Sequence, residues 1–338
     1  MNRREFLLYT GAAASLGLLS RSSAFGQAPA AAAPTPAPTK TAVPVQMPAP
    51  VTEFRALRRN VGLFTGRGGT IGWLSSPAAL AIVDTQFPET AAICLAGLPG
   101  RGGRMIDVVI DTHHHGDHTG GNGTFKSAAK MIAAQKNVPA LQLAAFERTK
   151  QDLERRDREN HAATPTPMPA APTYPDFLFG DNWRKELGDE VMSAKFFGPS
   201  HTGGDVAVYF ERANVVHVGD LLFNRLYPVT DRPGGCNLRH WVTAMEDIAK
   251  TYPQDALYVY GHGKKEFGVT GPQTDLFVFR DFLTALVEHT DKEIKAGKSR
   301  AEIIKLTNLP GWPDYFADDK TSRLPGNLGA AYDELTGA

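Results

Sequence analysis

The sequence has no excess of charge of either sign. Lys and Arg together number 36, Asp and Glu together also number 36, and the formal net charge is zero. Proteins that neutralise nucleic-acid phosphates usually carry a positive surplus, so this balance gives no reason to expect nucleic acid as a partner. Beyond its first residues the chain also lacks an apolar stretch long enough to cross a membrane, and it shows no internal repeat.

Cysteine is scarce as well. The 338 residues contain two, Cys94 and Cys236, so the fold cannot depend on a framework of several disulfides. Cys94 lies between Ile93 and Leu95 in a segment expected to be helical, which predicts a buried thiol and disfavours a bond to Cys236. The sequence alone leaves open whether the two pair.

The N-terminus opens with paired arginines, Arg3 and Arg4, and a modest apolar stretch follows from Leu7 to Leu19. This pattern resembles a bacterial twin-arginine signal peptide, and we assign it to residues 1–28. The apolar stretch is shorter than the ~20 residues of a spanning helix, so we expect no stable membrane association after removal of the signal. An uncleaved anchor is the alternative. The expected partner is the twin-arginine export machinery, and the expected location is periplasmic or otherwise exported.

Residues 29–50 are rich in Ala and Pro, a composition that has little to bury and favours an extended linker. The folded part is therefore expected to begin near Val51 and to comprise residues 51–338. That length suffices for one large core, and its C-terminal part is expected to be helical.

The most informative feature is the run from Thr112 to Asn122, THHHGDHTGGN. Imidazole and carboxylate groups bind zinc and similar divalent ions, and the pattern His113-x-His115-x-Asp117-His118 places four of them in six positions. The spacing suits a pair of ions, with His113 and His115 turned to one and Asp117 and His118 to the other. A His-rich surface loop is the alternative. The apolar, β-branched segment that precedes the run predicts a buried strand and argues for a built site.

Three further candidates lie downstream, and each stands near the end of a predicted strand. His201 lies in a Gly/Pro loop before one apolar segment, Asp220 follows another, and His262 lies between two glycines after a third. Each alone is consistent with a turn residue. In this order after the long run, they are better interpreted as the remaining ligands.

The long run resembles the metal-binding motif of the metallo-β-lactamase fold superfamily, and its extended form is similar to that of glyoxalase II, a thioester hydrolase. The three downstream segments resemble the matching His-Thr-x-Gly, Gly-Asp and Gly-His elements. The resemblance implies seven ligands for two divalent ions, most simply Zn²⁺. The first ion would be held by His113, His115 and His201, the second by Asp117, His118 and His262, and Asp220 would bridge them.

The order of predicted elements agrees with the fold that the resemblance implies. Strands are expected at 60–64, 69–74, 79–84, 104–111, within 191–220 and at 257–260, and helices at 89–98, after Gly123, at 139–160, 241–250 and 273–296. Strands and helices alternate in two halves. We therefore expect an α/β fold, the αββα sandwich, with the metals at one edge between two β-sheets.

Two ions that share a water lower its pKa towards neutrality, and the resulting bridging hydroxide attacks a carbonyl whose oxygen is polarised by one ion. Asp117 is the expected catalytic residue, orienting the hydroxide or taking a proton. This chemistry predicts hydrolysis of an ester, thioester, lactone or related small molecule. A β-lactam hydrolase is the first alternative, although Cys236 follows Asp220 and does not occupy the place of the cysteine ligand of many lactamases. An iron-dependent oxidoreductase on the same fold and a non-catalytic binding protein are the others.

The sequence says little about substrate contacts. Asn224, Tyr227 and His240 are weak candidates, and the loops 224–235 and 162–175 are expected to border the pocket. The substrate itself is not predicted.

Four other polar residues receive provisional roles. His114, between two ligands, is expected to point the opposite way, and His217 alternates with valines and is expected in the core or at an edge. Asp111 and Asp205 are candidates to orient the ligating imidazoles through hydrogen bonds.

Overall fold

The computed structural model describes residues 51–161, 164–315 and 323–338, which belong to one compact unit. The expected signal peptide, residues 1–28, and the linker, 29–50, lie outside the described residues. Among the described helices, none is long and apolar enough to cross a membrane.

The first sheet has seven strands, and its order follows the chain. They are β1 (Glu53–Ala56), β2 (Val61–Thr65), β3 (Ile71–Ser75), β4 (Leu80–Val83), β5 (Val108–Asp111), β6 (Ile132–Gln135) and β7 (Phe177–Phe179). Strands β1 to β4 form an antiparallel meander, and β4 to β7 are parallel. Every residue of β4, β5 and β6 is buried, as expected for parallel strands covered on both faces.

The second sheet has six strands. Its order is β15 (Thr270–Gly271), β13 (Leu257–Val259), β11 (Val215–His217), β10 (Val206–Phe210), β9 (Glu190–Phe196) and β8 (Asn182–Leu187). A separate parallel pair is formed by β12 (Phe223–Asn224) and β14 (His262–Gly263), and it places Phe223 opposite His262.

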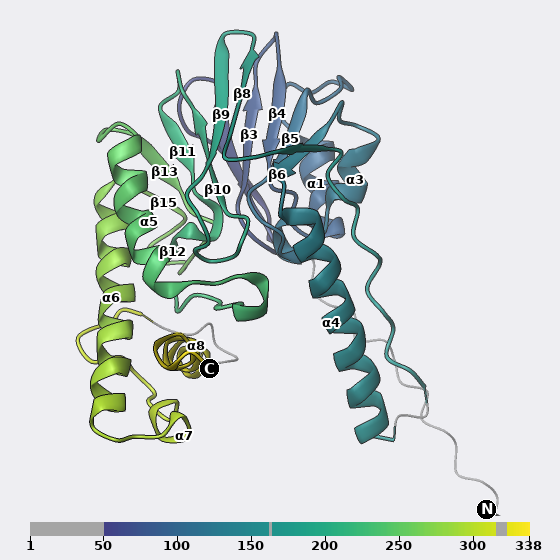
Figure 1. The fold of residues 1–338 in the computed structure, drawn as a ribbon. Coiled ribbons are helices and arrows are strands. Elements are labelled where there is room, and N and C mark those ends of the chain that lie inside the picture. Colours follow the sequence, from purple (N-terminus) through teal and green to yellow (C-terminus); the bar gives the residue numbers. More distant parts are fainter. Residues whose placement is uncertain (1–50, 162–163, 316–322) are drawn as a thin grey trace, which may run out of the picture. The chain divides into compact units, whose positions relative to one another are not determined.

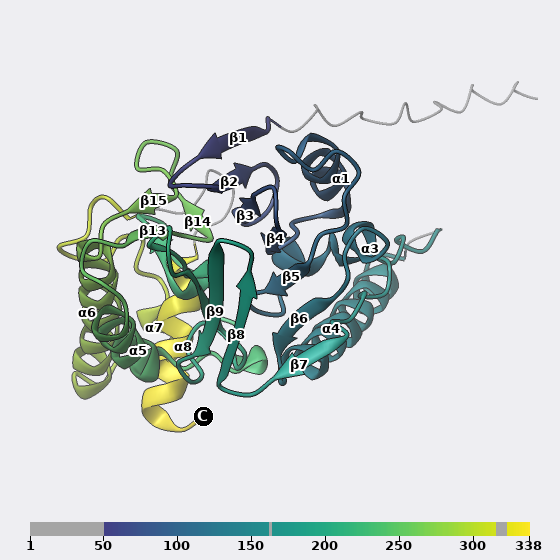
Figure 2. The same ribbon diagram turned by 90° about the horizontal axis from the view of Figure 1, so that it is seen from above.

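The helices cover the outer faces of both sheets. They are α1 (Pro88–Gly97), α2 (Gly116–Thr119), α3 (Asn122–Lys126), α4 (Val138–Glu159), α5 (Leu238–Thr251), α6 (Thr274–Lys295), α7 (Arg300–Ile303) and α8 (Leu324–Thr336). Figures 1 and 2 show α1, α3 and α4 beside the first sheet and α5 and α6 beside the second. The αββα sandwich expected from the sequence is therefore confirmed.

Side-chain alternation explains how the layers divide the core. In β2, Leu63 packs between the two sheets, whereas the next residue, Phe64, packs under α1. This period of two is what a strand buried on both faces requires. A third apolar cluster joins the second sheet to α5 and α6 and includes Trp241 and Phe279.

Helix α5 connects this core to the region of the motif. Its N-cap residue, Asn237, accepts a hydrogen bond from the backbone N–H of His240 at 2.9 Å. One turn in, the fully buried Trp241 donates to the carbonyl of Leu221 at 2.9 Å and packs against the ring of His201. The packing of the helical layer therefore supports both Leu221, beside Asp220, and His201.

Several short elements were not predicted from the sequence. Strand β6 has two alanines in four residues, and β1 and β7 have four and three residues, so none shows a clear periodicity. The strand expected over 104–111 begins at Val108, and Arg104 instead donates to the carbonyls of Ser76 and Pro77. Cys94 and Cys236 are both buried and both free.

Candidate metal centre

The seven predicted ligands come from four loops and meet at one edge of the two sheets. Four of them lie on the motif loop that follows β5, and α2 begins within this loop. His201 lies between β9 and β10, Asp220 in the short 3-10 turn after β11, and His262 at the start of β14. The topology therefore brings together residues that are about 150 positions apart, as ligands at strand ends predict.

The first group contains His113, His115, His201 and one oxygen of Asp220. Nδ1 of His115 lies 3.1 Å from Nε2 of His113 and 3.0 Å from Nε2 of His201. Oδ2 of Asp220 lies 3.4 Å from Nε2 of His201 and 3.9 Å from Nε2 of His113. Two nitrogens each about 2.0–2.1 Å from one tetrahedral ion lie roughly 3.3 Å apart, so the spacing fits a shared ion.

The second group contains Asp117, His118 and His262, and the other oxygen of Asp220 faces it. Nε2 of His262 lies 3.3 Å from Nε2 of His118 and 3.0 Å from Oδ2 of Asp117. Oδ1 of Asp220 lies 3.0 Å from Nε2 of His118 and 3.5 Å from Nε2 of His262. The two oxygens of one buried carboxylate thus divide between the two groups.

Hydrogen bonds behind the rings fix which nitrogen carries the proton. Asp84 accepts from Nδ1 of His118 at 2.7 Å and from the hydroxyl of Thr112 at 2.9 Å. Because that hydroxyl has donated its proton to Asp84, its oxygen accepts from Nδ1 of His113, 3.1 Å away. The inward Nε2 atoms of His113 and His118 therefore carry lone pairs.

Outward hydrogen bonds also fix the protonated nitrogen of His201 and of His115. Nδ1 of His201 donates to the carbonyl of Val229 at 3.1 Å, and Nε2 of His115 donates to Oδ2 of Asp231 at 3.2 Å. Inward lone pairs about 3 Å apart repel one another unless a cation lies between them. Oδ1 of Asp220 is buried and, within the part of the chain that the structure describes, makes no hydrogen bond. These nitrogen and oxygen donors fit divalent ions such as zinc at both groups.

A family model of the metallo-beta-lactamase superfamily matches residues 64–266. The chain belongs to this superfamily. The matched span contains all seven residues of the two groups.

Curated relatives are similar over part of their length. The chain is 26% identical over 170 residues to a hydroxyacylglutathione hydrolase of Brucella anthropi, covering 50% of this chain and 53% of that protein. It is 30% identical over 151 residues to a hydroxyacylglutathione hydrolase of Methylococcus capsulatus, covering 43% of each. The chain thus spans about half the length of the curated relatives it matches.

Solved structures share the fold. A stereoselective inverting sec-alkylsulfatase from Pseudomonas sp. superposes with a TM-score of 0.60 at 18% identity, over 81% of this chain and 49% of that one. A metallo-beta-lactamase from Pontibacter korlensis superposes with a TM-score of 0.51 at 18% identity, over 69% of this chain and 99% of that one.

Electrostatics at this superfamily site favour a bound cation. Burial is the main reason that the pKa of His201 falls to about 3, so its ring is neutral. Burial opposes the ionisation of Asp220, yet His118 and His262 hold its pKa below the usual carboxyl range. Burial opposes the protonation of His118 and His262, but the neighbouring carboxylate of Asp220 raises the pKa of both rings. The buried carboxylate therefore attracts positive charge, which a metal ion can supply in place of protons.

The second group faces solvent more than the first. The side chains of Asp117 and His262 are 30% and 23% exposed, whereas His113 and His201 are almost fully buried. The side of Asp117 is thus the solvent-facing side of the site.

The two carboxylates that support the imidazoles are Asp84 and Asp231, and neither was predicted from the sequence. Asp84 ends an apolar strand and has a positive φ of 65°, but a lone aspartate there gives no distinctive signal. The proposed supports, Asp111 and Asp205, have other partners. Asp111 accepts a hydrogen bond from Asn122, and Asp205 accepts from the backbone and hydroxyl of Thr202.

The other histidines lie where the sequence placed them. His217 is fully buried, its Nε2 donates to the carbonyl of Thr70 at 3.0 Å, and its Nδ1 accepts from the N–H of Gly219 at 3.2 Å. His114 belongs to neither group, and its Nε2 lies 3.3 Å from Oδ2 of Asp231, the oxygen that His115 also contacts.

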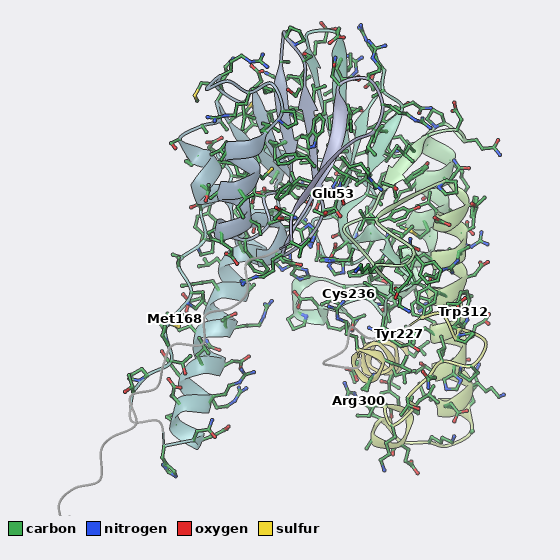
Figure 3. The ribbon with its side chains drawn as sticks, turned by 180° about the vertical axis from the view of Figure 1, so that it is seen from behind. Glu53, Met168, Tyr227, Cys236, Arg300 and Trp312 are labelled. Atoms are coloured by element: carbon green, nitrogen blue, oxygen red, sulfur yellow. The ribbon has the colours of Figure 1, made fainter. Side chains whose placement is uncertain are left out.

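The structure gives the three weak substrate candidates other environments. Asn224 donates to the carbonyls of Phe267 and Gly268 and so holds the loop that contains these two residues in place. Tyr227 is 2% exposed, and its hydroxyl accepts from the N–H of Leu309 at 3.3 Å in the helical core (Figure 3). His240 packs its ring against Gly198. Tyr227 in particular is not available to a substrate.

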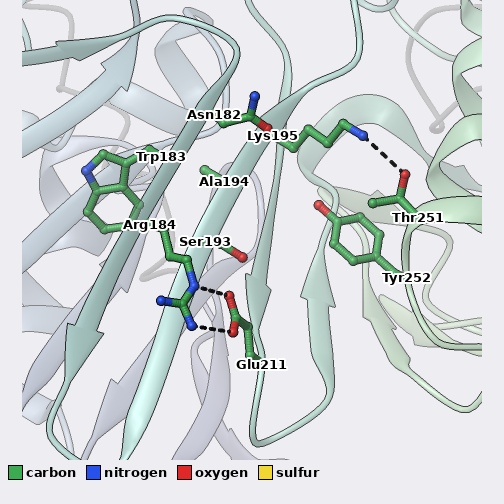
Figure 4. Close-up of a pocket in the computed structure, with 9 residues that line it drawn as sticks. All are labelled: Asn182, Trp183, Arg184, Ser193, Ala194, Lys195, Glu211, Thr251 and Tyr252. Carbon is green, nitrogen blue, oxygen red and sulfur yellow. Dashed lines mark hydrogen bonds and ion pairs between the residues drawn. The ribbon is translucent and has the colours of Figure 1, made fainter.

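A hollow of about 360 Å³ lies elsewhere, on β8 and β9 (Figure 4). Its charged groups already have partners, since Arg184 makes paired hydrogen bonds to Glu211 and Lys195 reaches the hydroxyl of Thr251. No candidate ligand and no residue of the motif loop lines it, so it is not the reaction site.

Proposed function

We propose that this protein is an exported, dinuclear metal-dependent hydrolase of small molecules, with zinc as its preferred ion. The observation that carries the proposal is the division of Asp220, whose two oxygens face two separate groups of inward nitrogen donors. His113, His115 and His201 hold the first ion. Asp117, His118 and His262 hold the second.

Bound divalent ions supply a water of lowered pKa and polarise the bond to be cleaved. The chain holds the donors in place: the rings of His118, His115 and His201 donate outward to Asp84, Asp231 and the carbonyl of Val229, and each keeps its lone pair turned inward. Asp117, the most exposed carboxylate of the set, orients the attacking water and takes its proton.

An activated carbonyl compound is the substrate class that we propose, namely an ester, thioester or lactone. Support comes from the names of the two curated relatives, which are hydroxyacylglutathione hydrolases. A β-lactam is the less favoured substrate, because Asp220 and not cysteine is the bridging donor, and Cys236 is buried. Seven converging donors also favour two hydrolytic ions over a single iron of an oxidoreductase.

Metal content tests the proposal directly. The protein purified without chelator should carry close to two divalent ions per chain, mainly zinc, when measured by inductively coupled plasma mass spectrometry. His118→Ala and His262→Ala should each lose one ion, because each removes a donor of the second group. Removing both ions with a chelator should abolish ester hydrolysis, and added zinc should restore it.

His114→Ala is the matched control for the metal measurement. It removes an imidazole from the same loop, but one that belongs to neither group of donors. It should keep both ions. Wild-type protein with no bound metal, or with one iron and oxygen-dependent chemistry, contradicts the hydrolase.

Export is the second part of the proposal, and it rests on the sequence of residues 1–28. Replacing Arg3 and Arg4 together with Lys should leave the precursor in the cytoplasm, because paired guanidinium groups and not charge alone are recognised. Cell fractionation and immunoblotting measure the distribution. Replacing Lys40 in the linker with Arg is the control and should not alter it. Normal export of the double Lys variant assigns the protein to another route.

A further inference from the structure

A mostly apolar cavity of about 600 Å³ lies beside the motif loop. Its walls are the turn at Phe87 and Pro88, one face of α4 that includes Ala145 and Phe146, and residues 169–173. Figure 3 marks Met168, which precedes the last of these segments, next to α4. The volume falls within the range of about 300–1,000 Å³ that small-molecule sites occupy.

Two buried polar side chains in the wall have polar atoms without a hydrogen-bond partner among the described residues. Gln142 is 3% exposed, and neither its amide nitrogen nor its amide oxygen makes a hydrogen bond. His114 is 2% exposed, and its Nδ1 has no partner. Unpartnered buried polar groups are rare in folded proteins, and here both belong to one cavity. A ligand with its own donor and acceptor satisfies them.

The cavity adjoins the metal centre through the backbone of the motif loop. Gly116 lines the cavity and lies in the chain between His115 and Asp117, one donor from each group. A Cβ at Gly116 would meet no atom within 4 Å, so open space begins at this residue. A molecule in the cavity therefore contacts the motif loop that carries four of the candidate ligands.

We propose that this cavity binds the non-reacting part of the substrate, and that this part is an apolar acyl or alkyl group that carries an amide. The apolar walls take the hydrocarbon, and the amide exchanges paired hydrogen bonds with Gln142. This assignment rests on the proposed hydrolase, because it names the substrate class of the same site. Whatever the chemistry, the cavity itself is testable by binding.

The binding experiment uses the full chain as purified and titrates three probes by calorimetry: hexanamide, acetamide and hexanoate. Hexanamide has both the hydrocarbon and the amide and should bind at least tenfold more tightly than either of the others. Gln142→Leu keeps the volume of the side chain but removes its amide, and it should weaken the binding of hexanamide at least tenfold. Ala145→Trp fills the cavity and should abolish binding.

Ala144→Trp is the matched control, since Ala144 is the exposed neighbour of Ala145 on α4 and does not line the cavity. It should bind hexanamide like the wild type. Thermal unfolding verifies that the three variants fold. Hexanamide that binds no more tightly than acetamide, or that binds Ala145→Trp as well as wild type, overturns the assignment.

A kinetic experiment links the cavity to catalysis. The 4-nitrophenyl esters of acetate and of N-hexanoylglycine differ in the apolar amide part. The wild type should prefer the longer ester, and Ala145→Trp should lower the ratio of the two kcat/KM values at least tenfold, whereas Ala144→Trp should not. An unchanged ratio overturns the assignment. Hexanamide binding with no hydrolysis of either ester refutes the hydrolase and leaves the cavity as a binding site.

Discussion

Replacing Asp220 with asparagine should lower the turnover of an activated ester by at least about 100-fold, because the variant cannot supply an anionic oxygen to both groups of donors. The amide keeps the size of the carboxylate. It offers one oxygen, and its nitrogen turns N–H groups towards one set of imidazoles or the other. We therefore expect one bound ion or fewer per chain, measured together with kcat.

The fold should tolerate the Asp220→Asn change. Asp220 is 3% exposed, but its Oδ1 makes no hydrogen bond that the variant would lose. Asp107→Asn is the control: Asp107 accepts from the N–H of Leu80 at the opposite end of β5 from the motif loop. It should keep both ions and full turnover. An Asp220→Asn variant as active as the wild type would remove the bridging role.

The αββα fold was predictable because its central strands are apolar runs that end in turn residues. The segments that became β4 and β10 show this pattern, and the motif follows a strand as expected. Strands β6 and β7 were not predictable, since each depends on pairing within the parallel part of the sheet and not on its own composition.

The candidate site was predictable only in its inner layer. The motif residues and the three downstream candidates have distinctive neighbours in the sequence, and the structure brings all of them together. Asp231 lies in a Pro/Gly loop and contacts His115 from 116 positions away. Contacts of this kind follow from the path of the loop, which no local pattern encodes. The place of Gln142 in the cavity wall was not predictable either, because in the sequence it is one polar residue among others in a helix.

Asp84 carries the last prediction, because it supports both the fold and the second metal group. It is fully buried and accepts hydrogen bonds from His118 and from the backbone and hydroxyl of Thr112. Asp84→Ala leaves these three donors unsatisfied, at about 1–3 kcal/mol each. Alanine also tolerates the φ of 65° poorly. We expect a loss of at least about 3 kcal/mol in the free energy of unfolding by urea.

Asp84→Asn separates the two roles. Asparagine tolerates the positive φ, and its oxygen still accepts from the backbone N–H of Thr112, so part of the stability should remain. Its amide nitrogen cannot accept from Nδ1 of His118, so that ring is no longer held in one tautomer. The affinity for the second ion should therefore fall by about 10–100-fold. Asp111→Asn is the control, because its amide oxygen can still accept from Asn122. If Asp84→Asn binds both ions with wild-type affinity, Asp84 supports only the fold, and the orientation of His118 comes from the packing around its ring.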